Sequence, residues 1–333
     1  MFCKLNLLIK KLRKNHSKLV YFIFFIYFLI GVLTFKNYGI SIDESFQRLS
    51  GFEWLKYLLN CANFTTFDEV INLKILAADN YTLPNFYQNL KYSIFFDVPS
   101  ALIEILFKIE ESKIYFQIRH FFNFIIFFLS SIYFYKLLKN RFMCTNVSTL
   151  GLLFYILSPK IYGASFYNNK DVVFLSVLVI AIYYFFKVLD NLNYRNILLL
   201  SSTLAIATTF RIIGIFFPLM FLIFYLLAVI SKKKELIHLP KILLFLFFYI
   251  LFLYIFWPYL WESPIKKFIS LFNVSEMLIE MKIWFNGNYI NSNFLPSHYL
   301  ITWIIISTPI VHLIFFFLGF IFCFKKFLKS FLN

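Results

Sequence analysis

The chain has 333 residues, of which 61% are apolar and 14% are charged, and its formal net charge is +16. Soluble domains carry about 25% charged residues, so this composition excludes an ordinary soluble fold. Apolar runs that recur along the chain indicate membrane-spanning helices instead.

The first element is a basic segment followed by an apolar run. Residues 1–18 hold six Lys or Arg residues, and the apolar run 19–35 follows them. This order resembles a signal peptide, but Lys36, Asn37 and Tyr38 after the run provide no small-residue cleavage site. We therefore predict an uncleaved first membrane span.

The apolar runs together predict an all-α, polytopic transmembrane helical bundle that forms a single domain over residues 1–333. The eight predicted spans are 19–35, 121–138, 147–157, 172–186, 197–208, 212–230, 242–257 and 300–323. The third and fifth spans are too short to cross about 30 Å of hydrocarbon alone. We expect each of them to end in a cavity or a thinned region.

The distribution of charge predicts the orientation of the bundle. If eight spans are drawn with the N-terminus inside, the inside segments carry 18 basic residues and two acids, and 14 of each lie outside. The whole charge of +16 then falls on one face, which is the positive-inside pattern. It predicts that both termini are cytoplasmic, and it explains the basic composition without a nucleic-acid partner.

Two large segments, 36–120 and 258–299, then lie on the outer face. Within the first, apolar residues recur at helical spacing from Phe46 to Leu59, and 93–107 is apolar with embedded acids. Such segments favour helices that lie along the membrane interface, so we expect interfacial helices in a large first periplasmic loop.

The first candidate for chemistry is a carboxylate pair, Asp43 and Glu44, shortly after the first span. A carboxylate there can serve as a general base that takes the proton of an acceptor hydroxyl group. The alternative is a capping box, in which Ser41 caps a helix and Glu44 reaches back. That alternative accounts for Glu44 and leaves Asp43 free.

The second candidate lies between the third and fourth predicted spans, at Asn169, Lys170 and Asp171. A cation there can hold a phosphate group of a ligand, while the adjacent acid faces the rest of that ligand. The alternative is that Asp171 or Asn169 caps the fourth span.

The third candidate is Arg211, between the fifth and sixth predicted spans. The planar guanidinium group matches phosphate oxygens. The alternative is a side chain that extends to the outer lipid head groups.

Further polar and aromatic residues are predicted on the outer face. They are Lys91, Arg119, His120, Tyr259, Trp261 and His298. The aromatic residues fit an interfacial belt as well as sugar stacking. The cysteines Cys3, Cys61, Cys144 and Cys323 have no paired spacing, so we expect neither a zinc site nor a disulfide framework.

The chain resembles the GT-C superfamily of polytopic glycosyltransferases, which includes protein O-mannosyltransferases and the bacterial aminoarabinose and galacturonic acid transferases of lipid A. It is most similar to bacterial dolichyl-phosphate-mannose-mannosyltransferase-like proteins. The resemblance rests on the order of the motifs Gly39–Glu44, Phe95–Pro99, Arg119–His120, Ser158–Lys160, Phe166–Asp171, Arg211–Gly214, Trp261–Pro264 and Pro296–Leu300.

This resemblance implies inverting transfer of a sugar from a polyprenyl-phosphate donor to a lipid, glycan or protein acceptor, at the periplasmic face of a bacterial inner membrane. It implies catalytic roles for Asp43, Glu44 and Asp171. It also implies donor-phosphate binding by Lys170 and Arg211, with Lys91 and Arg119 as weaker candidates. Substrate contacts are expected from His120, Asn169, Tyr259, Trp261 and His298. The acid pair is not the Asp-x-Asp of metal-using relatives, so no metal or cofactor is expected.

Two other classes of protein remain as alternatives. A transporter or lipid flippase places its site near the membrane midplane, often between internal repeats. A non-catalytic scaffold binds partners through its outer loops. The chain shows no internal repeat and few charges within its spans, which favours the enzyme.

Overall fold

The computed structural model describes residues 2–79, 91–230, 239–272 and 280–332. Helices dominate this part of the chain. They are α1 (Phe2–Thr34), α2 (Glu44–Cys61), α3 (Asp68–Asp79), α4 (Ile94–Leu106), α5 (Ser112–Phe142), α6 (Thr145–Ile156), α7 (Pro159–Tyr167), α8 (Asp171–Asp190), α9 (Tyr194–Phe210), α10 (Phe216–Ile230), α11 (Leu239–Phe256), α12 (Pro264–Ser270), α13 (Tyr299–Ser307) and α14 (Ile310–Leu332). Two short strands, β1 (Lys282–Phe285) and β2 (Asn288–Asn291), pair antiparallel.

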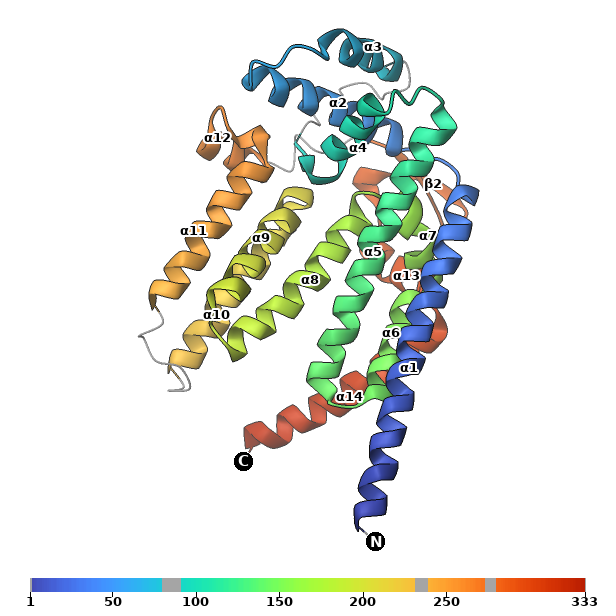
Figure 1. The fold of residues 1–333 in the computed structure, drawn as a ribbon, viewed down its shortest axis with the longest axis vertical. Coiled ribbons are helices and arrows are strands. Elements are labelled where there is room, and N and C mark those ends of the chain that lie inside the picture. Colours follow the sequence, from blue (N-terminus) through green and yellow to red (C-terminus); the bar gives the residue numbers. More distant parts are fainter. Residues whose placement is uncertain (1, 80–90, 231–238, 273–279, 333) are drawn as a thin grey trace.

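The two ends of the helical bundle are formed by different parts of the chain (Figure 1). The N- and C-termini lie at one end, which we call the terminal end. Helices α2, α3 and α4 lie across the other end, which we call the α2–α4 end, and α12 lies beside them. The prediction of helices within residues 36–120 is therefore confirmed, and so is the all-helical membrane fold.

Six helices in the described part of the chain are long and apolar enough to cross a membrane. They are Lys18–Asn37, Ser112–Phe142, Asp171–Asp190, Ile212–Ile230, Leu239–Phe256 and Ile310–Leu328. A seventh results if α6 and α7, which meet at a bend of 59°, form one broken span. The chain is thus a multi-pass membrane protein. The predicted count of eight exceeds this number, and the difference lies in the two short runs.

Those two short runs behave differently from each other. The predicted span 147–157 is α6, which bends into α7 at Pro159 because proline cannot donate an amide to the helix. The predicted span 197–208 is α9, which has 17 residues and is about 25 Å long. Helix α9 packs against both α8 and α11. Every residue of the last two turns of α9, Leu204 to Phe210, is buried.

The last predicted span, 300–323, is divided by proline. Helix α13 ends at Ser307, Thr308 is extended, and α14 begins at Ile310. Pro309 disfavours helical backbone at Thr308, which explains the break. The candidate span therefore begins about ten residues later than predicted, at Ile310.

Helices α2 and α4 approach each other closely at Gly51. A Cβ atom at this position would lie 2.5 Å from the carbonyl oxygen of Asp97, which no real side chain tolerates. Glycine therefore permits the contact that holds α4 against α2. The same interface buries an apolar cluster that includes Phe52, Leu55 and Ala101. This packing fixes the position of Asp97 relative to the start of α5.

Candidate functional site

The carboxylate of Glu44 anchors the start of α2 to α5. Its Oε2 atom accepts a hydrogen bond from the backbone N–H of Ser41 at 2.6 Å, which is one half of the expected capping box. Its Oε1 atom lies 2.9 Å from Nε2 of His120. Both side chains are buried. The Ser41 hydroxyl, instead of capping α2, points to the carbonyl oxygen of Tyr167 at 3.4 Å.

Asp43, next to this anchor, is in the opposite situation. It occupies the N-cap position of α2, is exposed, and makes no side-chain capping hydrogen bond. The two neighbouring acids therefore differ in function within the fold. Glu44 is committed to His120 and Ser41, whereas Asp43 is available to solvent and ligands at the α2–α4 end.

A second buried carboxylate, Asp97 of α4, joins α5 to the segment before α8. Arg119 Nη2 donates to Asp97 Oδ1 at 2.5 Å, and Asn169 Nδ2 donates to the same atom at 3.5 Å. Burial raises the pKa of Asp97 from 3.8 to about 7, because the loss of solvent outweighs the opposing charges of Arg119 and Lys170. Asp97 thus links the Arg119–His120 motif to the Phe166–Asp171 motif.

Several polar atoms around these two carboxylates are buried and make no hydrogen bond within the described part of the chain. They are Gln47 Oε1, Arg119 Nε and Nη1, His120 Nδ1, Asn123 Oδ1 and Asn169 Oδ1. Buried polar groups are costly unless they are hydrogen-bonded. This set includes both donors and acceptors.

The start of α8 is held by a residue that the sequence analysis did not single out for this role. Asn168 Oδ1 accepts from the backbone N–H of Asp171 at 2.8 Å and from that of Lys170 at 3.3 Å. The alternative in which Asp171 or Asn169 caps this helix is therefore not observed. Asn168 reaches the amides from the turn before the helix, which frees the Asp171 carboxylate for another partner.

That partner is Arg211, the residue directly after α9. Its Nε donates to Asp171 Oδ1 at 2.8 Å, and its Nη2 donates to the same oxygen. The side chains are 38% and 55% exposed, so the pair is open to solvent. Lys170 lies beside it with Nζ 3.4 Å from the centre of the Tyr92 ring. Two basic residues therefore neighbour Asp171 at the start of α8, Lys170 in sequence and Arg211 through its hydrogen bonds.

The predicted phosphate ligands differ in how accessible they are to a ligand. Lys170 is half-buried and Arg211 is partly exposed, so a ligand can reach both. Arg119 is 1% exposed and paired with Asp97, which makes it part of the scaffold. The backbone carbonyl of Lys91 accepts from Trp257 Nε1 at 2.7 Å and thereby ties the loop before α4 to the end of α11.

The predicted aromatic and histidine contacts lie further from the carboxylates. Trp261 Nε1 donates to the carbonyl of Tyr254 at 2.7 Å, and its ring lies 6.1 Å from that of Tyr57. The Tyr259 hydroxyl pairs with Ser270 at 3.3 Å. His298 is exposed beside Phe285. Within the described residues, no hydrogen bond, ion pair or ring contact connects these three to Asp43, Asp97 or Asp171.

The described residues hold no group of three or more His, Cys, Asp or Glu side chains placed to bind a metal ion. Cys61, Cys144 and Cys323 are free and exposed.

Comparison with known proteins finds one matching family. Residues 98–261 match the family model described as dolichyl-phosphate-mannose-protein mannosyltransferase. No curated protein and no solved structure gives a significant match. The matched region contains the Arg119–His120, Phe166–Asp171 and Arg211–Gly214 motifs of the resemblance to GT-C enzymes, whereas Gly39–Glu44 and Pro296–Leu300 lie outside it. This match, which covers just under half of the chain, supports a membrane glycosyltransferase of the GT-C type.

Proposed function

We propose that this glycosyltransferase moves a sugar from a polyprenyl-phosphate donor to a hydroxyl group of a lipid, glycan or protein acceptor, with inversion at the anomeric carbon. The reaction takes place at the α2–α4 end. The observation that carries the proposal is the separation of roles between two adjacent acids, because Glu44 is buried against His120 and Asp43 is exposed.

Asp43 serves as the general base in this proposal. A base must reach the acceptor hydroxyl, and the Asp43 carboxylate is exposed without a capping hydrogen bond. Glu44 acts as a positioning residue, since its contacts with Ser41 and His120 fix the first turn of α2 against α5. The pair therefore combines one rigid carboxylate with one accessible carboxylate.

Lys170 and Arg211 hold the donor phosphate. They flank Asp171, which orients the guanidinium group of Arg211 through the hydrogen bonds to its Oδ1 atom. Asp171 then faces the sugar. Asn169 and His120, with their unpaired buried atoms, supply hydrogen bonds to substrate hydroxyl groups. Tyr259, Trp261 and His298 line the approach of the acceptor.

The reaction is balanced without a further reactant. The acceptor oxygen attacks the anomeric carbon from the side opposite the phosphate, and a new carbon–oxygen bond forms. The bond between that carbon and the phosphate oxygen breaks, and its electron pair leaves with the polyprenyl phosphate. The hydroxyl proton passes to Asp43. Lys170 and Arg211 stabilise the charge on the departing phosphate, so it leaves without protonation.

The orientation follows from the basic residues of the predicted inside segments. The terminal end faces the cytoplasm, and the α2–α4 end faces the periplasm of a bacterial inner membrane. The donor enters between helices from the outer leaflet.

The test is the variant Asp43→Asn, assayed in membranes for sugar transfer from a polyprenyl-phosphate donor. General-base help contributes about 10²–10⁴-fold to a rate, so we expect a loss of that size in kcat. Glu111→Gln is the matched control, because Glu111 is also an exposed N-cap acid without a side-chain capping bond, at the start of α5. Undiminished turnover by Asp43→Asn, or an equal loss in the control, removes Asp43 from this role.

A further inference from the structure

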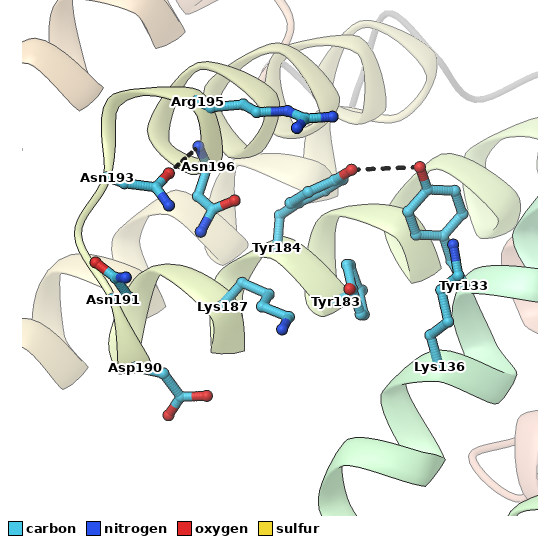
Figure 2. Close-up of a pocket in the computed structure, with 10 residues that line it drawn as sticks. All are labelled: Tyr133, Lys136, Tyr183, Tyr184, Lys187, Asp190, Asn191, Asn193, Arg195 and Asn196. Carbon is cyan, nitrogen blue, oxygen red and sulfur yellow. Dashed lines mark hydrogen bonds between the residues drawn. The ribbon is translucent and has the colours of Figure 1, made fainter.

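A cavity of about 510 Å³ lies at the terminal end, away from the proposed reaction site (Figure 2). Its lining comes from the end of α5, the end of α8, the following loop and the start of α9. The lining residues are Tyr133, Lys136, Tyr183, Tyr184, Lys187, Asp190, Asn191, Asn193, Arg195 and Asn196. Three of them are basic and one is acidic, so the cavity is positively charged.

The basic side chains of this cavity are not neutralised by ion pairs. Within the described part of the chain, no salt bridge involves Lys136, Lys187 or Arg195. Lys136 Nζ instead lies 4.9 Å from the centre of the Tyr133 ring, and Lys187 Nζ lies 5.8 Å from that of Tyr183. Asp190 lies at the edge of the group in Figure 2, apart from Lys136 and Arg195. The cations are therefore available to an anion.

Two tyrosine hydroxyls add a hydrogen-bond donor to this cavity. The hydroxyls of Tyr133 and Tyr184 lie 3.2 Å apart and bridge α5 to α8. In such a pair one hydroxyl donates to the other, so the second keeps its hydrogen for another acceptor. Cations and a hydroxyl donor around one space are the groups that recognise phosphate oxygens.

A second cavity, of about 390 Å³, adjoins the first and shares Tyr183, Lys187 and Asp190 with it. Its remaining lining is mostly apolar and includes Leu137, Leu138, Phe142 and Phe186, with Arg141 and Asn140. A free phosphate ion would make no contact with the apolar cavity beside its site. A phospholipid would fill that cavity, because its glycerol and acyl chains continue from the phosphate.

We propose that the terminal-end cavity binds the head group of an anionic phospholipid, with its phosphate between Lys136, Lys187 and Arg195 and its glycerol and upper acyl chain along the adjoining cavity. Basic pockets between transmembrane helices are suited to such head groups, and the cytoplasmic leaflet carries negative surface potential. This site is distinct from the donor-phosphate site at the α2–α4 end. It joins α5, α8 and α9 through a lipid of the surrounding membrane.

The test uses the purified full-length protein in detergent, mixed with equal amounts of dioleoylphosphatidylglycerol and dioleoylphosphatidylcholine. Native mass spectrometry then measures which lipid is retained. We expect preferential retention of phosphatidylglycerol. The variant K136Q/K187Q/R195Q should bind it about a hundredfold more weakly, since each basic residue near an anionic head group contributes roughly a factor of five.

The matched control is K18Q/K139Q/K241Q, which removes the same charge from residues at the terminal end that do not line either cavity. We expect it to change retention less than about threefold, because only the general attraction is weakened. Equal losses in the two variants, or no preference of the native protein for the anionic lipid, overturn the proposal.

Two further measurements test the role of the tyrosine hydroxyl and the role of the adjoining apolar cavity. Tyr184→Phe keeps the aromatic ring and removes one hydroxyl, and we expect weaker retention of phosphatidylglycerol with unchanged thermal unfolding. Soluble glycerol phosphate is the second probe. If it competes as well as the lipid at equal concentration, the adjoining cavity does not hold the glycerol and acyl part, and the assignment to a lipid is wrong.

Discussion

The charged side chains at the two ends of the bundle differ in their partners. At the α2–α4 end several of them are buried in pairs, as in Arg48–Glu104, with side chains 7% and 1% exposed, beside exposed groups such as Asp43. At the terminal end they are exposed and, within the described residues, lack ion-pair partners, as with Lys136 and Arg195. A buried charge requires a partner and thereby fixes geometry, whereas an exposed charge remains free to bind. The first arrangement suits a rigid reaction site, and the second suits a lipid head group.

The largest stability effect should come from breaking the buried pair between α2 and α4. Arg48 Nε lies 3.0 and 3.2 Å from the two oxygens of Glu104, and the guanidinium carbon lies 3.8 Å from the centre of the Tyr115 ring. Arg48→Met leaves a buried carboxylate without a partner. We expect a loss of about 3–5 kcal/mol in the free energy of unfolding, measured by denaturant or thermal unfolding in detergent.

Two variants sharpen this comparison. Arg48→Met with Glu104→Leu removes both buried charges, so the pair of changes should restore most of the stability lost in the single variant. Lys139→Gln, at an exposed position of the terminal end, should change stability by less than about 0.5 kcal/mol. A single Arg48 variant as stable as the Lys139 variant contradicts the distinction between the two ends.

The next prediction concerns how the free energy of unfolding depends on pH through Asp97. Its pKa is raised by burial from 3.8 to about 7, so the folded state binds more protons than the unfolded state between these values. Asp97 therefore contributes most to stability below pH 4, and this contribution is lost as pH rises toward 7. For one proton the slope is at most about 1.4 kcal/mol per pH unit.

The variant Asp97→Asn tests this dependence. It should flatten the decrease in unfolding free energy between pH 4 and 7 relative to the native protein, with little change in slope above pH 7. The measurement is the unfolding free energy at a series of pH values in detergent. An unchanged slope across that window means that other groups, and not Asp97, set the pH dependence.

The sequence predicted the elements of this structure better than their contacts. Helical periodicity and apolar length indicated the spans and the helices of the first outer segment, because these patterns are local. The capping-box pattern correctly placed the Glu44 carboxylate at the Ser41 amide. Pro309 was visible in the sequence, but the long apolar run around it led to a prediction of one continuous span where the structure has two helices.

The partners of the buried charges were not predictable in the same way. His120 and Glu44 are 76 positions apart, and Arg48 and Glu104 are 56 positions apart. Each residue was visible alone, but the pairs depend on how α2 and α4 cross the end of α5. The capping role of Asn168 was missed because it depends on the backbone of the turn before α8, where three polar residues compete for the same amides.

A small stability effect is expected at the exposed pair between Asp171 and Arg211, and kinetic measurements on the same variants distinguish a structural role of the pair from a role in donor binding. Because these side chains are 55% and 38% exposed, removing either one should cost less than about 1 kcal/mol of stability.

Asp171→Asn and Arg211→Gln break the same pair, but only the second removes the cation. If Arg211 holds the donor phosphate, Arg211→Gln should raise the apparent KM for the polyprenyl-phosphate donor about tenfold or more, since a lost charge-assisted hydrogen bond costs roughly 1.5–3 kcal/mol. Asp171→Asn, which keeps the cation, should raise that KM less. Equal KM values for the two variants, with equal stability, would mean that the pair acts as a structural link between α8 and α9 and that the donor phosphate is bound elsewhere.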